Sequence, residues 1–220
     1  MKARDGRSDL MVGGDTFLFM QGMGMRHVDL DTWETRPATL AEHREATIVA
    51  DALENCHMAD AIFSYTEIEG IPPAIVFLET LASGLRYSGK VQHYGYAKDV
   101  AIFATQVAQD LGILIEPEID ASAPLTMFEG AIDATFTFVE GGMPIQPTVG
   151  VTMGGESPAT TAGTLVLGAA MVMGWVVLVQ LIRKGAPLSI QYGMKPMDMS
   201  RGSALFGSVV NSLAHVGFNQ

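Results

Sequence analysis

The feature that most constrains this sequence is an alternation of short β-type runs with helical patterns. Six strands are expected, each followed by a helix, and the units are separated by turns rich in Gly, Asp, Pro and Ser. The expected strands cover residues 17–23, 61–65, 91–94, 114–119, 145–151 and 188–192. The expected helices begin near residue 39 and then cover residues 71–87, 98–111, 126–140, 162–182 and 202–216. This order predicts an α/β fold in which helices cover a parallel sheet.

Two architectures satisfy this alternation: an open doubly wound sheet and a (β/α)8 barrel of the TIM type. A complete barrel needs eight units over about 250 residues, so six units predict an incomplete one. No Gly-rich phosphate-binding fingerprint follows the first expected strand, which disfavours an open dinucleotide-binding sheet. We therefore expect residues 1–220 to form a single partial (β/α) barrel domain that lacks an N-terminal section and the last barrel strands.

Local signals place the ends of several helices. Thr39 and Glu42 have the spacing of a capping box, in which each residue satisfies a backbone N–H near the start of a helix. Pro72 and Pro73 suit the first turn of the next helix, where a missing N–H costs little. Gly112 is expected to end the third helix.

Charge and cysteine content exclude several classes of protein. Lys and Arg number 13 against 24 Asp and Glu, a formal net charge of −11, whereas nucleic-acid binding requires clustered basic residues. The single cysteine, Cys56, cannot form an internal disulfide or a thiolate zinc cluster, so no metal site is expected. Residues 1–7 lack the apolar run of a signal peptide, which indicates a cytoplasmic protein.

The uncharged run from Ala162 to Ile182 admits a second interpretation. It is long enough to span a bilayer, which takes about 20 apolar residues, and Arg183 and Lys184 follow it directly. The run is interrupted, however, by glycines and polar residues at Thr164, Gly168, Gly174 and Gln180, and the segments on both sides of it belong to the βα repeat. We therefore favour a buried helix of a soluble protein over a single membrane span.

Candidate functional residues follow from the barrel hypothesis, because barrel enzymes place their chemistry at the carboxyl ends of the strands. These positions are rich in aromatic residues and carboxylates and poor in cations, which suits an apolar cationic ligand such as a quaternary ammonium. The expected substrate-binding residues are Tyr65, Glu67, His93, Tyr94, Tyr96, Asp120, Glu156, Ser157, Tyr192 and Asp198. The four tyrosines are the expected aromatic faces, and no catalytic residue is assigned.

Some of these residues also have purely structural interpretations. His93 could serve only to satisfy hydrogen bonds within its strand. In the run Gly154 to Pro158, Ser157 could cap the following helix with Pro158 in its first turn, or the backbone N–H groups could receive a ligand carboxylate. Cys56 and His57 are adjacent but point in different directions on a helix, so Cys56 is expected to be a packing residue.

One continuous set of motifs resembles a known family. The motifs are Gly154-Gly155-Glu156-Ser157-Pro158, residues 162–166, residues 179–187, Tyr192-Gly193, Met197-Asp198-Met199 and Gly207-Ser208. They are similar to those of the trimethylamine methyltransferase family, the corrinoid-dependent methyltransferases with a (β/α)8 barrel. The resemblance covers most of this chain but only the middle of the family's full length.

The resemblance implies a methyltransferase. It would move a methyl group from a methylated amine, either a quaternary amine such as glycine betaine or trimethylamine, to the Co(I) corrinoid of a partner protein. The chain itself would bind no cofactor directly, no nucleic acid and no membrane, and a homo-oligomer is expected. Such an enzyme must hold the cation, align one methyl group for in-line attack and exclude water.

Two features limit what the resemblance implies. Pyrrolysine, which some family members carry late in the barrel, would fall beyond the end of this chain. The family commonly has polar residues in the helix after Thr164 and Leu165, whereas this chain has the apolar run 167–171 there, so the identity of the amine stays open. An alternative function is a catalytically inactive barrel fragment that binds quaternary amines.

Overall fold

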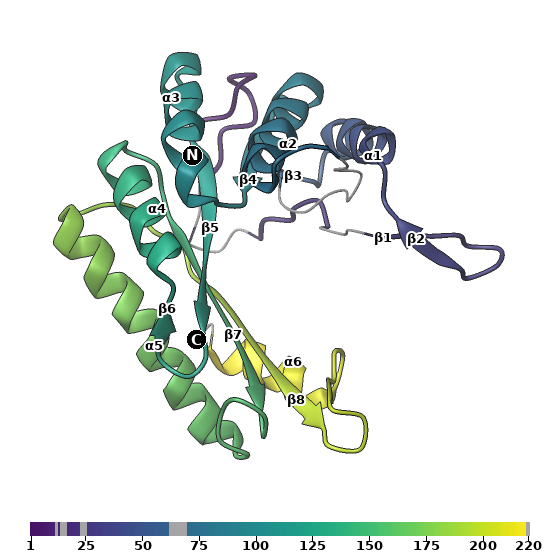
Figure 1. The fold of residues 1–220 in the computed structure, drawn as a ribbon, viewed down its shortest axis with the longest axis vertical. Helices are drawn as coiled ribbons and strands as arrows, with labels where there is room; N and C mark the ends of the chain where they lie inside the picture. Colours follow the sequence, from purple (N-terminus) through teal and green to yellow (C-terminus); the bar gives the residue numbers. More distant parts are fainter. Residues whose placement is uncertain (12, 14–16, 23–25, 62–69, 219–220) are drawn as a thin grey trace.

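The computed structural model describes residues 1–220 except 12, 14–16, 23–25, 62–69 and 219–220 (Figure 1). The helices are α1 (Leu40–Ala52), α2 (Pro73–Tyr87), α3 (Ala101–Leu111), α4 (Glu129–Glu140), α5 (Thr161–Ile182) and α6 (Val209–Phe218), and a 3-10 turn, η1 (Lys98–Val100), leads into α3. The strands are β1 (Arg26–Val28), β2 (Thr35–Pro37), β3 (Met58–Ala61), β4 (Val91–Tyr94), β5 (Ile115–Ser122), β6 (Thr126–Met127), β7 (Gln146–Met153), β8 (Gln191–Asp198) and β9 (Ser203–Ala204).

The main sheet adds its parallel strands in one direction, in the order β3-β4-β5-β7-β8. Upstream, Met20 forms a parallel bridge with Met58, which places the first expected strand at the edge beside β3. The sheet curls, and helices cover its convex side (Figure 1). An open doubly wound sheet reverses its strand order at a switch point, and the described strands show no such reversal. The expected parallel α/β fold is thus confirmed, as a curled half-barrel.

A continuous apolar core fills the space between the convex side of the sheet and its helices. Tyr94 of β4 meets Phe138 of α4 edge to face, with ring centroids 6.3 Å apart. Trp175 and Val179 of α5 are also fully buried in this core. Burial of these large side chains drives the docking of the helices onto the sheet.

The local sequence signals are confirmed at three helix ends. The Thr39 side chain accepts a hydrogen bond from the Glu42 N–H, and Glu42 in turn accepts from the Thr39 N–H, so the capping box forms. Pro73 occupies the first turn of α2. Gly112 adopts a left-handed conformation, with φ of 66°, as the C-cap of α3.

Other boundaries differ from the sequence-based expectation. The strand expected at 61–65 begins earlier, at Met58, and residues 62–65 lie outside the described part of the chain. The strand expected at 188–192 runs instead from Gln191 to Asp198. The short antiparallel strands β6 and β9, which pair with β5 and β8 beyond tight turns, were not expected.

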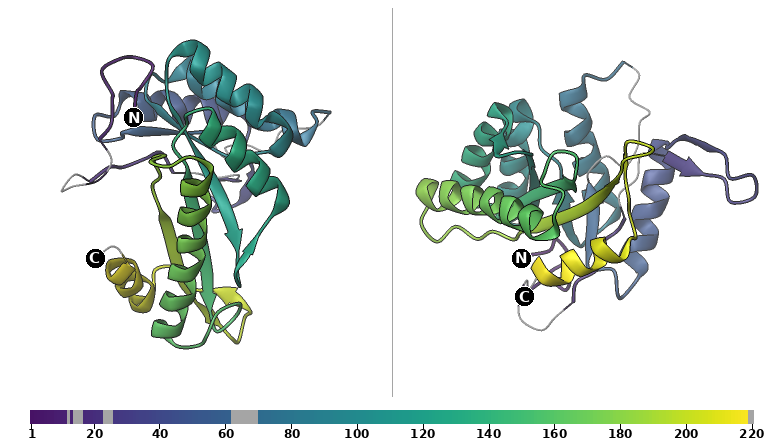
Figure 2. Two further views of the ribbon diagram at one scale, coloured as in Figure 1. Left: turned by 90° about the vertical axis from the view of Figure 1, so that its left-hand side faces the viewer. Right: turned by 90° about the horizontal axis from the view of Figure 1, so that it is seen from below.

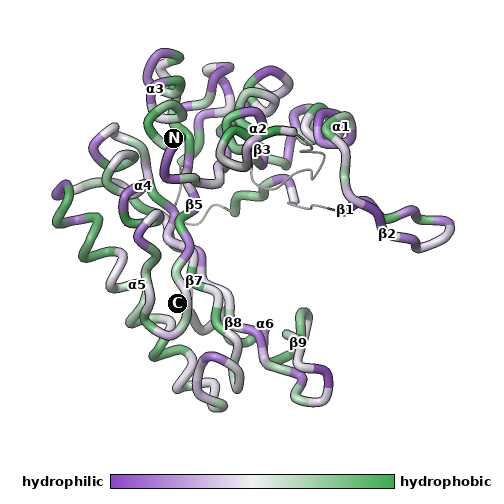
Figure 3. The backbone as a smooth tube through the Cα atoms, in the orientation of Figure 1, coloured by the Kyte–Doolittle hydropathy of each residue, from purple (hydrophilic) through white to green (hydrophobic). Residues whose placement is uncertain are grey.

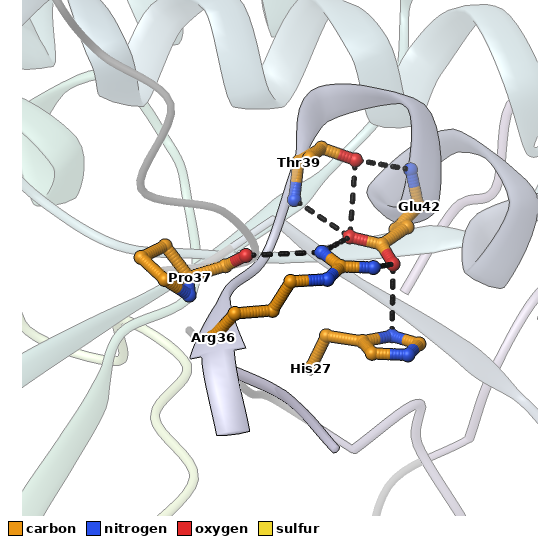
Figure 4. Close-up of polar contacts among 5 residues, drawn as sticks. All are labelled: His27, Arg36, Pro37, Thr39 and Glu42. Atoms are coloured by element: carbon orange, nitrogen blue, oxygen red, sulfur yellow. Dashed lines mark hydrogen bonds and ion pairs between the residues drawn. The ribbon is translucent and has the colours of Figure 1, made fainter. Parts of the chain in front are cut away.

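The segment expected to be a long connection contains a β-hairpin, β1–β2, that projects from the body of the molecule (Figure 1). Figure 4 shows how Glu42 of α1 anchors its base. The Glu42 carboxylate accepts two hydrogen bonds from the Arg36 guanidinium, at 2.6 and 2.9 Å, and lies 2.8 Å from His27 Nδ1. The Arg36 bonds and the cap at Thr39 lower the pKa of Glu42 to about 2. The same carboxylate therefore caps α1 and orients the hairpin.

The long apolar helix is confirmed as α5, but burial is limited to one of its faces. Thr164, Gly168 and Trp175 lie against the sheet, whereas Val166 is 71% exposed and Leu181 is 80% exposed. Figure 3 shows neutral and hydrophobic colours along most of this helix. Among the described residues, α5 is the one helix whose length and composition would suffice to cross a membrane.

Candidate functional site

The two faces of the central strands have opposite character. Successive residues of a strand point to opposite sides, and in β5 one set, which includes Ile115 and Ile119, packs into the core beneath the helices. The alternate set, Glu116, Glu118 and Asp120, points to the concave side. The concave face of this sheet is therefore polar and acidic.

His93 of β4 is the centre of a buried polar network on this face. Its Nε2 donates a hydrogen bond to Gln146 Oε1 of β7 at 2.7 Å and lies 3.5 Å from Glu118 Oε2, while its Nδ1 lies 3.9 Å from Asp60 Oδ1 of β3. Gln146 also donates to Glu116, at 3.4 Å, and Ser189 donates to the other oxygen of Glu116 at 2.7 Å. This concave-face network thus joins four neighbouring strands and the segment before β8, and its members are Asp60, His93, Glu116, Glu118, Gln146 and Ser189.

The network shifts the pKa values of its members. Burial by itself lowers the pKa of His93, but the acceptors Asp60, Glu118 and Glu116 outweigh it and raise that pKa above its ordinary value. Burial raises the pKa of Glu118, assisted by the nearby Asp120 and opposed by His93. The arrangement favours a positive charge at its centre, and its carboxylates are suited to neutralise a bound cation.

Asp120 and Tyr96 lie together nearer the carboxyl end of the sheet. Burial raises the pKa of the Tyr96 hydroxyl, and the neighbouring Asp120 carboxylate raises it further. Partial burial also raises the pKa of Asp120, which keeps an exposed surface. Together with Glu118, these two residues place one aromatic side chain and two carboxylates on adjoining elements.

Tyr94 and Tyr192 lie elsewhere, since both point into the core on the helix side of the sheet. Tyr192 is 7% exposed, and burial raises its pKa to about 12. Its hydroxyl donates to the carbonyl of Thr164 in α5 at 3.4 Å, and its ring packs against Gly168. The expectation that all four tyrosines surround one ligand is therefore not matched for these two, because α5 and α4 cover them.

The loop after β7 holds Glu156 and Ser157 in a self-contained turn. The carboxylate of Glu156 accepts from the Thr152 N–H at 3.0 Å, and the Ser157 hydroxyl donates to the Thr152 carbonyl. The backbone N–H groups of residues 154–157 all donate to carbonyls within this loop, so they do not point at a ligand carboxylate. The alternative in which Ser157 caps the next helix is not observed either, because the Thr160 side chain accepts from the Gly163 N–H and α5 begins at Thr161.

Asp198 ends β8 at the same edge of the parallel sheet as Glu156. Its carboxylate accepts from the N–H and the hydroxyl of Ser200, and these bonds lower its pKa. It therefore organises the turn that leads to β9. Tyr65 and Glu67, which were expected at the end of the second strand, lie outside the described residues.

A cavity of about 410 Å³ opens at the other edge of the sheet, near the amino ends of β5 and β8. Apolar side chains of the N-terminal segment, including Leu10 and Met11, line it together with Glu116 and Ser189. In the described part of the chain, no group of three or more His, Cys, Asp or Glu side chains is arranged to hold a metal ion.

Sequence reasoning missed most of the concave-face network. Asp60, Glu116, Glu118 and Gln146 lie within strands, whereas the barrel hypothesis points to the residues at the carboxyl ends of strands. One available signal was the alternation of acidic with apolar residues in the run from Glu116 to Asp120, which is unusual for a strand of a parallel sheet buried on both faces.

Comparison with known proteins decides the family. The sequence model of the trimethylamine methyltransferase family (MTTB) matches residues 1–220. The chain belongs to the trimethylamine methyltransferase family. The resemblance seen in its motifs is thereby confirmed.

Two curated proteins of the bacterium Desulfitobacterium hafniense are similar to this family member. The glycine betaine methyltransferase of strain Y51 is 26% identical over 219 residues, which cover 94% of this chain and 45% of that protein. The trimethylamine methyltransferase MttB of strain DSM 10664 / DCB-2 is 26% identical over 228 residues, covering 99% of this chain and 45% of that protein. The chain thus spans less than half the length of both relatives.

Proposed function

We propose that this chain forms part of a (β/α)8 barrel methyltransferase that takes a methyl group from a cationic methylated amine. The family match along residues 1–220 carries the proposal. The one-directional parallel strand order supports the barrel, because each barrel strand pairs with the next along the chain. Glycine betaine and trimethylamine are the two substrates to test first, and a cytoplasmic location is part of the proposal.

The concave-face network supplies the cation-binding chemistry in this proposal. Glu118 and Asp120 face a bound onium group, and Tyr96 lies beside it. His93, which is hydrogen-bonded to Gln146, lies 3.5 Å from the Glu118 carboxylate and orients it. The C–N bond of the amine breaks, nitrogen keeps the bonding pair and leaves as a neutral amine, and the methyl group passes to the acceptor. The acceptor we propose is Co(I) of a corrinoid carried by a partner protein, and no residue of this chain is assigned to it.

Binding tests the proposed site. At an effective dielectric constant of about 20, a carboxylate about 6 Å from a monocation contributes about 3 kcal/mol. Glu118→Gln should therefore weaken glycine betaine binding by at least about tenfold in calorimetric titration. Glu140→Gln, at an exposed position at the end of α4, is the matched control and should leave affinity unchanged.

The ligand and the pH provide further checks. 3,3-Dimethylbutanoate, in which carbon replaces the quaternary nitrogen, should bind far more weakly than glycine betaine. Because the pKa values of Glu118 and Asp120 are raised above 4.5 and 3.8, affinity for the cation should rise with pH through a range above those values. Equal affinity for the charged and uncharged ligands would remove the cation site from the proposal.

Activity separates the enzyme from the alternative of an inactive binding fragment. The purified protein is mixed with glycine betaine or trimethylamine and a chemically reduced Co(I) corrinoid, and the demethylated amine is measured by mass spectrometry. Formation of dimethylglycine or dimethylamine supports the enzyme. Binding without demethylation, in the presence of the corrinoid partner as well, favours the fragment that binds amines without reacting them.

A further inference from the structure

Two exposed apolar surfaces on opposite sides of the molecule complement each other in charge. One is the tip of the β1–β2 hairpin, and the other is the outer face of α5 near its carboxyl end (Figures 1 and 2). Neither surface is accounted for by the concave-face network or by the proposed methyl transfer.

The hairpin tip combines apolar and acidic side chains. Leu30 is 76% exposed and Trp33 is 75% exposed. Trp33 adopts a left-handed φ of 59°, and its N–H donates to the Asp29 carbonyl, so the backbone of the turn is held at the residue that presents the exposed indole. The exposed carboxylates of Asp31 and Glu34 lie on either side of it in sequence.

The base of the hairpin is fixed as well. The Glu42 carboxylate binds Arg36 twice and contacts His27 while capping α1 (Figure 4). The hairpin is therefore a preorganised arm, which lowers the entropic cost of docking its tip.

The receiving surface combines apolar and basic side chains. Met173, Val177 and Leu181 are 57%, 52% and 80% exposed, and they lie at helical spacing along one side of α5. Arg183 and Lys184 follow immediately, and within the described residues neither forms an ion pair with a carboxylate.

We propose that the hairpin tip of one copy of this chain docks on the outer face of α5 of a second copy. Leu30 and Trp33 would pack on Val177 and Leu181, with Asp31 and Glu34 facing Arg183 and Lys184. Because the two surfaces lie on opposite sides of one copy, the contact is between copies and head to tail. Such a contact closes into a ring or continues as an open chain, according to the rotation between copies.

Sedimentation velocity over a range of protein concentrations tests this assembly. The wild-type protein should self-associate, and Trp33→Ser and Leu181→Ser should each raise the dissociation constant by about 30-fold or more, as for anchor residues of an interface. Ile102→Ser removes a side chain of α3 that is 60% exposed and away from both surfaces, so it should leave the constant unchanged. A wild-type protein that stays monomeric at all concentrations would overturn the proposal.

Charge reversal identifies the pairing. Glu34→Lys and Lys184→Glu should each weaken self-association by about tenfold. The combined variant should recover most of the loss, because the charges of the Glu34–Lys184 pair are then exchanged and the pair attracts again. Raising the salt concentration should reduce the differences in dissociation constant between these charge variants and the wild type. Failure of the combined variant to recover would show that the two surfaces do not meet.

A lipid surface is the competing occupant of the α5 face. Flotation with phosphatidylcholine vesicles distinguishes it, since the proposal expects no vesicle binding by the wild-type protein. Vesicle binding that is lost in Leu181→Ser but kept in Trp33→Ser would overturn the proposal in favour of a membrane contact.

Discussion

Gly168 and Gly174 occupy the same helix, but a methyl group added at each would meet very different surroundings. At Gly168, a Cβ would lie 2.1 Å from Tyr192 Cε2 and 2.8 Å from Tyr192 Cζ. The ring cannot move aside easily, because Tyr192 is buried between α5 and the sheet. At Gly174, the nearest atom is the terminal methyl group of Met127, at 3.1 Å. Relieving this contact takes a shift of a few tenths of an ångström, which a flexible thioether side chain can make.

These contacts predict opposite outcomes for two chemically identical substitutions. Replacing a helical Gly by Ala gains up to about 1 kcal/mol of helix propensity at either site. Gly168→Ala also overpacks the core, at a cost of about 1–3 kcal/mol. Gly174→Ala should therefore be neutral or stabilising, and Gly168→Ala should be less stable than Gly174→Ala by about 1–3 kcal/mol.

Urea unfolding followed by circular dichroism measures this difference, at protein concentrations low enough to keep the chain dissociated. Tyr192→Leu should remove much of the penalty of Gly168→Ala, so the two substitutions should show a coupling energy of about 1 kcal/mol or more in a double-mutant cycle. Equal unfolding midpoints for the two alanine variants would refute the placement of Tyr192 beneath α5.

Two further predictions concern the network and the start of α5. Because the pKa of His93 is raised in the folded state, the stability that its charge contributes is complete below pH 6.5 and is lost as the pH rises through the folded-state pKa. The difference in unfolding free energy between the wild type and His93→Gln should therefore shrink at alkaline pH. A difference that does not depend on pH would contradict the charged network. Thr160→Ala should lower the free energy of unfolding by about 1 kcal/mol, measured by thermal unfolding, because the N-cap of α5 is lost. The control Thr161→Ala should change it by no more than about 0.5 kcal/mol. Equal losses in the two variants would argue against the cap.

Features set by local chemistry could be predicted from the sequence. The capping box at Thr39 and the glycine end of α3 depend on residues only a few positions apart, and both form as expected. The hairpin β1–β2 was missed because its turn has no Asn-Gly or Asp-Gly pair. Instead, Asp29 accepts hydrogen bonds from the N–H groups of Asp31 and Thr32.

Features set by strand register could not be predicted in the same way. The face on which a strand residue lies changes with a shift of a single position, and the sixth strand was expected at 188–192 rather than at Gln191–Asp198. Tyr192 was therefore expected at the ligand, although it lies beneath α5. The proposed role of Glu118 depends on its proximity to His93, which is 25 positions away and becomes a neighbour only through the pairing of β4 with β5.

The alternation within β5 places the residues that build the core and those of the proposed cation site on opposite faces of one strand. Ile115 and Ile119 pack into the core beneath the helices, whereas Glu118 and Asp120 alternate with them along the strand and point to the concave side. Divergence among related sequences can therefore alter charge and polarity at Glu118 and Asp120 while the apolar positions keep the fold. A saturation library of β5 should accordingly tolerate more substitutions at Glu118 and Asp120 than at Ile115 and Ile119, and a new ligand preference could arise through single changes without an intervening loss of folding.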